Sequence, residues 1–213
     1  MKETGLMFKA PLVRSILDGS KTQTRRLVKP QPVAGQGMVN AAYCGDRNLW
    51  LRDGPCDKTD PAKEWRCPMG QPGDRIYVRE TFCYQWSDER GWLDECWFRA
   101  TTPDVEHPDG GEKSPWKPAI HMPKAVARIW PEITGVRVER LQQISEADCI
   151  AEGIAYDPGE GGVFHVPGFA GCSSDTATGA FQKLWESTGG DWAANPWVWV
   201  IDFRRDLAQG GLP

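Results

Sequence analysis

The chain has 213 residues, and its 25 Lys and Arg against 29 Asp and Glu give a formal net charge of −4. Hydrophobic residues make up 40% and charged residues 25% of the sequence, which is typical of globular proteins and excludes disordered, collagen-like and coiled-coil chains. The net charge also excludes a globally basic surface, so any contact with nucleic acid depends on a local basic cluster. The length favours one domain over 1–213 with its own hydrophobic core.

Targeting and redox features point to a soluble cytoplasmic protein. Residues 1–9 lack the apolar segment of a secretory signal peptide, and no apolar run approaches the roughly 20 residues of a membrane-spanning helix. The seven cysteines are an odd number, so a complete disulfide framework would leave one thiol over. We therefore expect reduced thiols and no contact with a membrane. Because metal-ligand spacings such as CxxC and nucleotide-binding Gly-rich loops are missing from the sequence, we expect no metal or other cofactor.

The first predicted elements are a short helix and a strand. Apolar residues recur at helical spacing over 12–17, Pro11 suits the first helical turn, and Gly19 suits the position just after the last turn. Residues 22–28 then alternate as in a strand with one polar face. The following segment, 31–71, is rich in Pro, Gly, Asp and Cys without periodicity, which predicts an insertion or a functional loop.

More strands are predicted in the middle of the chain. A Pro-Gly-Asp turn at 72–74 leads into a buried strand over 73–82, and 97–100 is its expected partner. Two further β-like patterns follow, over 125–129 and 133–141.

The last third of the chain has the clearest helix signals. Ser145 suits the N-cap of a helix, with a carboxylate three residues later and Gly153 as its stop. A second Gly-rich insertion follows at 157–179, then a helix over 180–187, then a strand over 197–204 that is apolar on both faces and therefore interior. Strands that outnumber short helices favour an α+β fold, in the form of a small, partly closed β-barrel with helices at its rim.

The densest polar motif is the segment 19–26, GSKTQTRR. One interpretation is a solvated polar strand. The other is a nucleophilic site in which the amine of Lys21 takes a proton from the Thr24 hydroxyl, with the pKa of Lys21 lowered by burial or by Arg25 and Arg26. A regular strand would place positions 21 and 24 on opposite faces, so this second interpretation requires a turn or bulge at Lys21.

Three other residues are candidates for a site. Glu152 falls in the last turn of its predicted helix, where the negative end of the helix dipole raises the pKa of a carboxyl group and suits a general acid; the alternative is an exposed Glu in a polar turn. Arg75 follows the turn at 72–74, where covering the rim of the core competes with ligand binding. Trp116 lies among Pro and Lys in a loop and could stack on a base, whereas the tryptophans of the last strand belong to the core.

Several sequence blocks occur together in a characteristic order. They are 19–26 after the short helix, 72–75 before a strand, 116–123, 144–154, 185–186 and 195–203. Over nearly the whole chain these blocks resemble the ASCH-domain family, whose fold is similar to the PUA RNA-binding domain, and especially its longer phage and prophage members. The resemblance implies a single domain with a barrel of about five strands, a cleft lined by the first motif, and insertions at about 31–71 and 157–179.

The resemblance also implies a chemistry. Small members similar in the first motif hydrolyse N4-acetylcytidine to cytidine and acetate, using a Lys, a Thr and a Glu that fall by motif position on Lys21, Thr24 and Glu152. Lys21 would activate Thr24, Thr24 would attack the acyl carbonyl, and Glu152 would protonate the departing amine. We assign substrate binding to four further residues, Arg25, Arg26, Arg75 and Trp116.

Two other functions stay open. A PUA-like module could capture RNA or a modified base without chemistry, with Lys21, Arg25 and Arg26 on phosphate, and some ASCH proteins are ribonucleases. This chain is about twice as long as the small hydrolases, so their substrate does not transfer directly to it. The expected partner in either case is a nucleoside, an RNA or a modified base.

Overall fold

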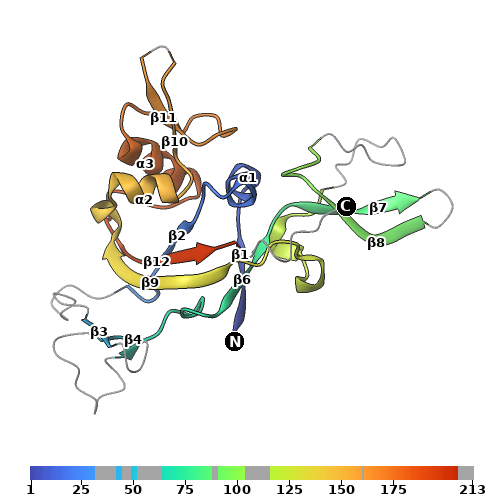
Figure 1. The fold of residues 1–213 in the computed structure, drawn as a ribbon, viewed down its shortest axis with the longest axis horizontal. Helices are drawn as coiled ribbons and strands as arrows, with labels where there is room; N and C mark the ends of the chain where they lie inside the picture. The colour runs from blue at the N-terminus through green and yellow to red at the C-terminus, as the bar shows by residue number, and fades with distance from the viewer. Residues whose placement is uncertain are drawn as a thin grey trace.

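The computed structural model describes residues 1–31, 42–44, 49–51, 64–87, 91–103, 116–159 and 161–205, and it has a mixed α and β fold in which strands predominate (Figure 1). The strands are β1 Glu3–Met7, β2 Gln23–Leu27, β3 Ala42–Cys44, β4 Leu49–Leu51, β5 Glu64–Trp65, β6 Arg75–Arg79, β7 Phe82–Ser87, β8 Gly91–Phe98, β9 Glu132–Arg140, β10 Ala155–Asp157, β11 Val163–His165 and β12 Trp197–Arg204. The helices are α1 Ala10–Asp18, α2 Glu146–Ala151 and α3 Ala177–Ser187, with short 3-10 turns η3 Ala119–His121, η4 Lys124–Val126 and η5 Leu141–Gln143.

A five-stranded sheet forms the centre, in the order β1-β6-β9-β12-β2. β1 runs parallel to β6, and the other neighbours are antiparallel. β12 lies between β9 and β2, and its residues 198–201 are all buried, which confirms the predicted interior strand. Within the described residues no backbone pairing joins the edge strands β1 and β2, so a closed barrel is not formed. The Arg26 side chain nevertheless reaches from β2 to the carbonyl of Met7 at the end of β1, at 2.9 Å.

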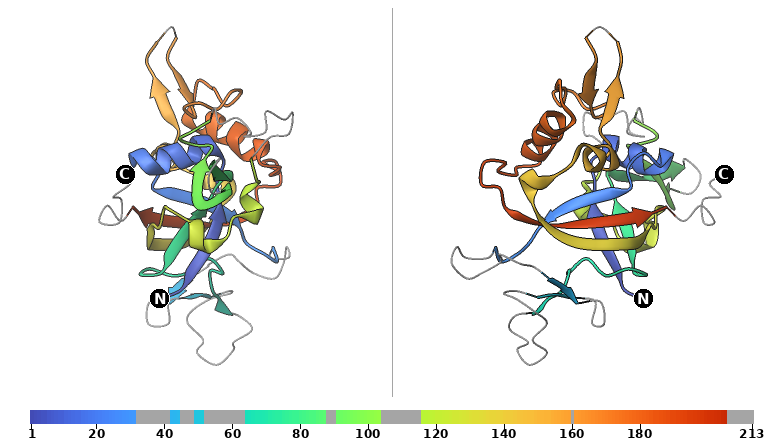
Figure 2. Two further views of the ribbon diagram at one scale, coloured as in Figure 1. Left: turned by 90° about the vertical axis from the view of Figure 1, so that its right-hand side faces the viewer. Right: turned by 60° about the vertical axis from the view of Figure 1, so that its left-hand side comes forward.

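The three α-helices lie over one side of this sheet (Figures 1 and 2). α1 has Pro11 in its first turn and ends before Gly19, whose φ of 85° is the left-handed conformation that glycine tolerates. α2 is capped by Ser145, whose side chain accepts a hydrogen bond from the amide of Asp148, as predicted. α3 buries Phe181, Leu184 and Trp185 on one face. All three predicted helices are therefore confirmed.

Two predictions in the middle of the chain need correction. The predicted strand over 73–82 is divided into β6 and the start of β7. The segment 97–100 meets it only at its end, where Phe98 of β8 pairs with Phe82 of β7. The β-like pattern at 125–129 is a 3-10 turn followed by irregular chain. Ile129 and Pro131 do accept hydrogen bonds from β6 through their carbonyls, but Pro131 has no N–H to return, so a regular strand cannot start there.

Both predicted insertions carry strands of their own. Most of 31–71 lies outside the described residues; β3, β4 and β5 form a three-stranded sheet within it. The second insertion begins in the β10–β11 hairpin, which projects beyond α2 and α3 (Figure 2), with the rings of Tyr156 and Phe164 5.0 Å apart.

Two simpler expectations can also be compared with the structure. Among the described residues no helix has the length and apolarity to cross a bilayer. The five cysteines whose side chains are described are all free thiols, as expected. The other two, Cys44 and Cys56, lie outside the described side chains.

Candidate active site

Four residues of the polar motif at 19–26 are buried. The exposed fraction is 2% for Lys21 and 3% each for Gln23, Thr24 and Arg25, so the interpretation as a solvated polar strand is wrong. Although β2 is an edge strand of the sheet, the helices cover it. Buried charges of this kind are tolerated only when they are paired and hydrogen-bonded, which directs attention to their partners.

The backbone around Lys21 is held by two helices. The Lys21 amide donates to the carbonyl of Ser15 in α1 at 2.8 Å, and the Thr22 amide donates to Ala151 at the end of α2 at 2.9 Å. β2 begins only at Gln23. Lys21 therefore precedes the strand, and the alternation that would separate it from Thr24 does not apply.

Lys21 and Glu152, 131 residues apart, form a buried ion pair. Lys21 Nζ donates to Glu152 Oε2 at 2.6 Å, to the Glu152 carbonyl at 2.8 Å and to the Gln23 carbonyl at 2.6 Å. Burial lowers the pKa of Lys21 from its usual value, and the charge of Glu152 opposes this effect. Glu152 is the residue after α2 and is 4% exposed, so the alternative of an exposed Glu is wrong.

Gly153 allows the helix end to approach this lysine. Its φ of 97° disfavours other residues. A Cβ at Gly153 would lie 3.4 Å from both the Lys21 and the Ser15 Cβ atoms. The stop signal of α2 therefore also helps to place Glu152 beside the amine.

Arg25 joins the same pair from the other side. Its Nη1 contacts Glu152 Oε1 at 3.4 Å and donates to Gln23 Oε1, while Nη2 contacts Glu139 Oε2 at 3.2 Å and Asp148 Oδ2 at 3.1 Å. The guanidinium thus bridges β2, β9 and α2. It was predicted to bind substrate, but its terminal nitrogens are occupied by protein acceptors.

Asp148 anchors the outer part of this network. Gln23 Nε2 donates to Asp148 Oδ1 at 2.9 Å, and Arg137 Nη2 does so at the same distance. Burial alone would raise the pKa of Asp148, but the hydrogen bond from Gln23 and the charges of Arg25 and Arg137 together lower it to about 2. Sequence reasoning did not assign a role to Gln23, Glu139 or Arg137. The sequence feature that could have identified these three residues is the occurrence of polar side chains at alternate positions of two predicted strands.

A cavity of about 90 Å³ opens beside the ion pair. Its lining combines the ends of β1, β2 and α2 with α1 and α3, and consists of Met7, Phe8, Lys9, Leu12, Lys21, Thr24, Arg25, Arg26, Glu152, Phe181, Leu184, Trp185 and Thr188. The three predicted catalytic residues therefore share one cavity. Among these lining residues four are basic and one is acidic, and the rest are mainly apolar or aromatic.

Two predicted substrate-binding residues do not line this cavity. Arg75 stands at the start of β6 opposite Glu3, at the far end of β1 from Met7. Trp116 is half-buried and precedes the bridge between Phe82 and Lys117. The structure therefore groups Arg25 and Arg26 with the catalytic candidates, and places Arg75 and Trp116 elsewhere.

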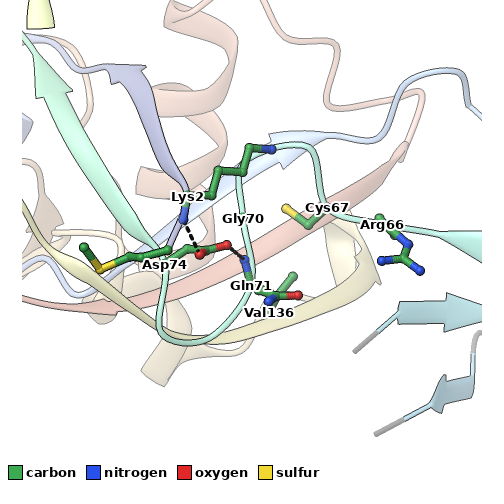
Figure 3. Close-up of a pocket in the computed structure, with 8 residues that line it drawn as sticks. Lys2, Arg66, Cys67, Gly70, Gln71, Asp74 and Val136 are labelled. Atoms are coloured by element: carbon green, nitrogen blue, oxygen red, sulfur yellow. Dashed lines mark hydrogen bonds between the residues drawn. The ribbon is translucent and has the colours of Figure 1, made fainter. Parts of the chain in front are cut away.

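A larger cavity of about 380 Å³ lies near the N-terminus (Figure 3). Its carboxylate, Asp74, accepts hydrogen bonds from the backbone amides of Lys2 at 2.6 Å and Gln71 at 3.0 Å, so it closes a turn. Burial raises the pKa of the Cys67 thiol in the same cavity, which disfavours the thiolate that a nucleophile needs. The smaller cavity is the better candidate for catalysis.

Comparisons of the chain with protein-family models, with curated proteins and with solved structures give no match. Within the described ranges no three His, Cys, Asp or Glu side chains are grouped as metal ligands would be. The residues around the small cavity therefore carry the functional interpretation.

Proposed function

We propose that this protein is an amidohydrolase that removes an acyl group from the exocyclic amine of a nucleobase, as in N4-acetylcytidine. The observation that carries the proposal is a buried pair of Lys21 and Glu152 that opens onto the same cavity as the hydroxyl-bearing Thr24. Amide hydrolysis through a covalent intermediate needs a nucleophile, a base for its proton and an acid for the leaving amine, and these three residues supply them. The proposal includes the PUA-like barrel of the ASCH family. A sheet in which Arg26 of one edge strand donates a hydrogen bond to the carbonyl of Met7 in the other edge strand is compatible with this fold.

The reactive form of the pair has a neutral Lys21 amine and a protonated Glu152. Burial favours the neutral amine, because it lowers the pKa of Lys21. Thr24 Oγ attacks the acyl carbon as its proton passes to Lys21 Nζ. The C–N bond breaks as the Glu152 proton passes to the leaving nitrogen, which leaves an acyl ester on Thr24 and an ion pair of Lys21 and Glu152.

Water completes the cycle. It attacks the ester carbonyl and gives one proton to the Glu152 carboxylate. The C–O bond to Thr24 then breaks as Thr24 Oγ recovers a proton from Lys21, which releases the carboxylic acid and restores the pair.

The dimensions of the cavity favour a small acyl group. Since one water needs roughly 10–15 Å³ of such space, a cavity of about 90 Å³ is large enough for an acetyl group. The apolar part of the lining, which includes Phe8, Phe181 and Trp185, would contact the planar base.

Turnover of N4-acetylcytidine, followed by chromatography of the nucleoside, tests the proposal. Thr24→Ala and Lys21→Ala should each abolish the release of cytidine. Thr22→Ala is the matched control, because Thr22 is an exposed hydroxyl in the same motif that does not line the cavity. Equal turnover in Thr24→Ala and Thr22→Ala would contradict the mechanism.

A second function, capture of RNA or a modified base without chemistry, is favoured by two cations of the cavity. Lys9 Nζ donates to the carbonyl of Ser187 at 2.9 Å, and Arg26 Nη2 donates to the carbonyl of Met7 at 2.9 Å. Since neither of these two hydrogen bonds is made to a carboxylate, a phosphate could bind there. Salt-sensitive RNA affinity that Arg26→Ala removes, together with no turnover by the unaltered protein, would support this function instead.

A further inference from the structure

We infer that Arg25 is a positioning residue, which holds the Glu152 carboxylate in the orientation in which one oxygen meets Lys21 and the other is fixed by the guanidinium. This inference rests on the proposed amidohydrolase function. It changes the role predicted for Arg25 from substrate binding to support of a catalytic group.

The two oxygens of Glu152 have different cationic partners. Oε2 lies 2.6 Å from Lys21 Nζ, and Oε1 lies 3.4 Å from Arg25 Nη1. A rotation of the carboxylate would weaken both contacts. The orientation of the acid is therefore determined by two cations on either side of it.

Arg25 is itself held rigidly. Its Nη2 contacts Glu139 of β9 and Asp148 of α2, so the guanidinium is bound by acceptors from two elements besides its own strand. The side chain is 1% exposed, and its Nε is buried without a hydrogen-bond partner among the described residues. Since both terminal nitrogens are occupied and Nε is shielded, the guanidinium has no free edge to offer a substrate phosphate.

The charge of Arg25 also acts on Lys21. Burial is the main cause that lowers the pKa of Lys21; Arg26 and Arg25 lower it further, and Glu152 opposes them. Removal of Arg25 should therefore raise the pKa of Lys21. The limb of the pH profile of kcat that reports the Lys21 amine should then move to higher pH.

The experiment compares pH profiles of N4-acetylcytidine hydrolysis for the unaltered protein, Arg25→Gln, Arg25→Lys and Arg137→Gln. Arg25→Gln should lower kcat by about 10-fold to 100-fold, leave KM nearly unchanged, and move the limb that reports Lys21 to higher pH. Arg25→Lys keeps the positive charge but cannot contact Glu152 with one nitrogen and Glu139 and Asp148 with another. In this variant kcat should therefore fall while the limbs of the pH profile stay in place. Arg137 contacts Glu139 and Asp148 but lies outside the contacts of Glu152, so Arg137→Gln should keep the limbs of the unaltered protein.

Several outcomes would overturn the inference. A raised KM with unmoved limbs in Arg25→Gln would assign the residue to substrate binding. If Arg25→Gln does not fold, as judged by circular dichroism, an unchanged kcat in Arg25→Lys would be decisive against positioning.

Failure of the proposed function can be distinguished from failure of the inference about Arg25. If the unaltered protein hydrolyses no acylated nucleoside, ¹⁵N NMR titration of the Lys21 amine still measures the pair without substrate. A higher midpoint in Arg25→Gln than in the unaltered protein would support the electrostatic link between Arg25 and the pair. Equal midpoints would refute it.

Discussion

Replacement of Glu152 by Gln removes the negative charge that faces a buried amine. The side chains of Lys21 and Glu152 are 1% and 5% exposed, so water cannot take over the role of the lost carboxylate. Loss of one partner from a buried ion pair destabilises proteins by about 3–5 kcal/mol, because the other charge stays uncompensated. Since whole domains are stable by only about 5–15 kcal/mol, Glu152→Gln should lower the free energy of unfolding by a large fraction.

The penalty should depend on pH with a definite sign. Burial already lowers the pKa of Lys21, and without Glu152 this pKa falls further. Between the folded-state pKa and the unfolded value of about 10.4, the unfolded chain binds more protons than the folded one, so stability rises with pH by up to about 1.4 kcal/mol per unit. Glu152→Gln should therefore recover stability as the pH rises from the folded-state pKa of Lys21 toward about pH 10, and show a constant penalty below that pKa.

Urea unfolding at pH 7 and pH 9.5 measures both effects. The matched control is Glu186→Gln, because Glu186 is an exposed residue of α3 and its replacement should change stability by only about 0.5 kcal/mol. The double variant with Lys21→Met should recover most of the loss, since it buries no unpaired charge. If Glu152→Gln is as stable as Glu186→Gln at both pH values, the buried-pair explanation fails.

Four further predictions follow from the same contacts. Thr24→Ala should lower kcat for N4-acetylcytidine by about 10³-fold or more, while calorimetry still detects nucleoside binding. N4-benzoylcytidine should be hydrolysed more slowly than N4-acetylcytidine in parallel assays, because the larger acyl group fits less readily into a cavity of about 90 Å³. Asp148→Asn should cost roughly 2 kcal/mol at pH 7; because the pKa of Asp148 is lowered to about 2, this difference should shrink in urea unfolding as the pH falls from about 4 to about 2. Glu80 is bound by Arg128 at 2.9 and 3.1 Å and is 1% exposed, so Glu80→Gln should lower the thermal unfolding temperature through a loss of about 3–5 kcal/mol.

Local sequence patterns determined most of the elements around the site. Pro11 and Gly19 delimit α1, Ser145 and Gly153 delimit α2, and the apolar residues 197–204 predict an interior strand. These features are local, because a cap or an alternation acts within one turn or one strand. The same patterns also indicate Lys21 and Glu152 as candidate site residues from the sequence alone.

Only the tertiary structure decided which of these elements meet. Alternation does not identify a strand's neighbour: the segment 97–100 meets the predicted strand over 73–82 only at its end, because β8 pairs with β7. Nor could it show that the polar strand at β2 is covered by helices, since polarity alone suggests solvent. The contact between Lys21 and Glu152 spans 131 residues, and the burial of Arg25 depends on acceptors from β9 and α2. Such contacts arise from the packing of distant segments, where the cost of burying a charge is offset only by partners that no local pattern identifies.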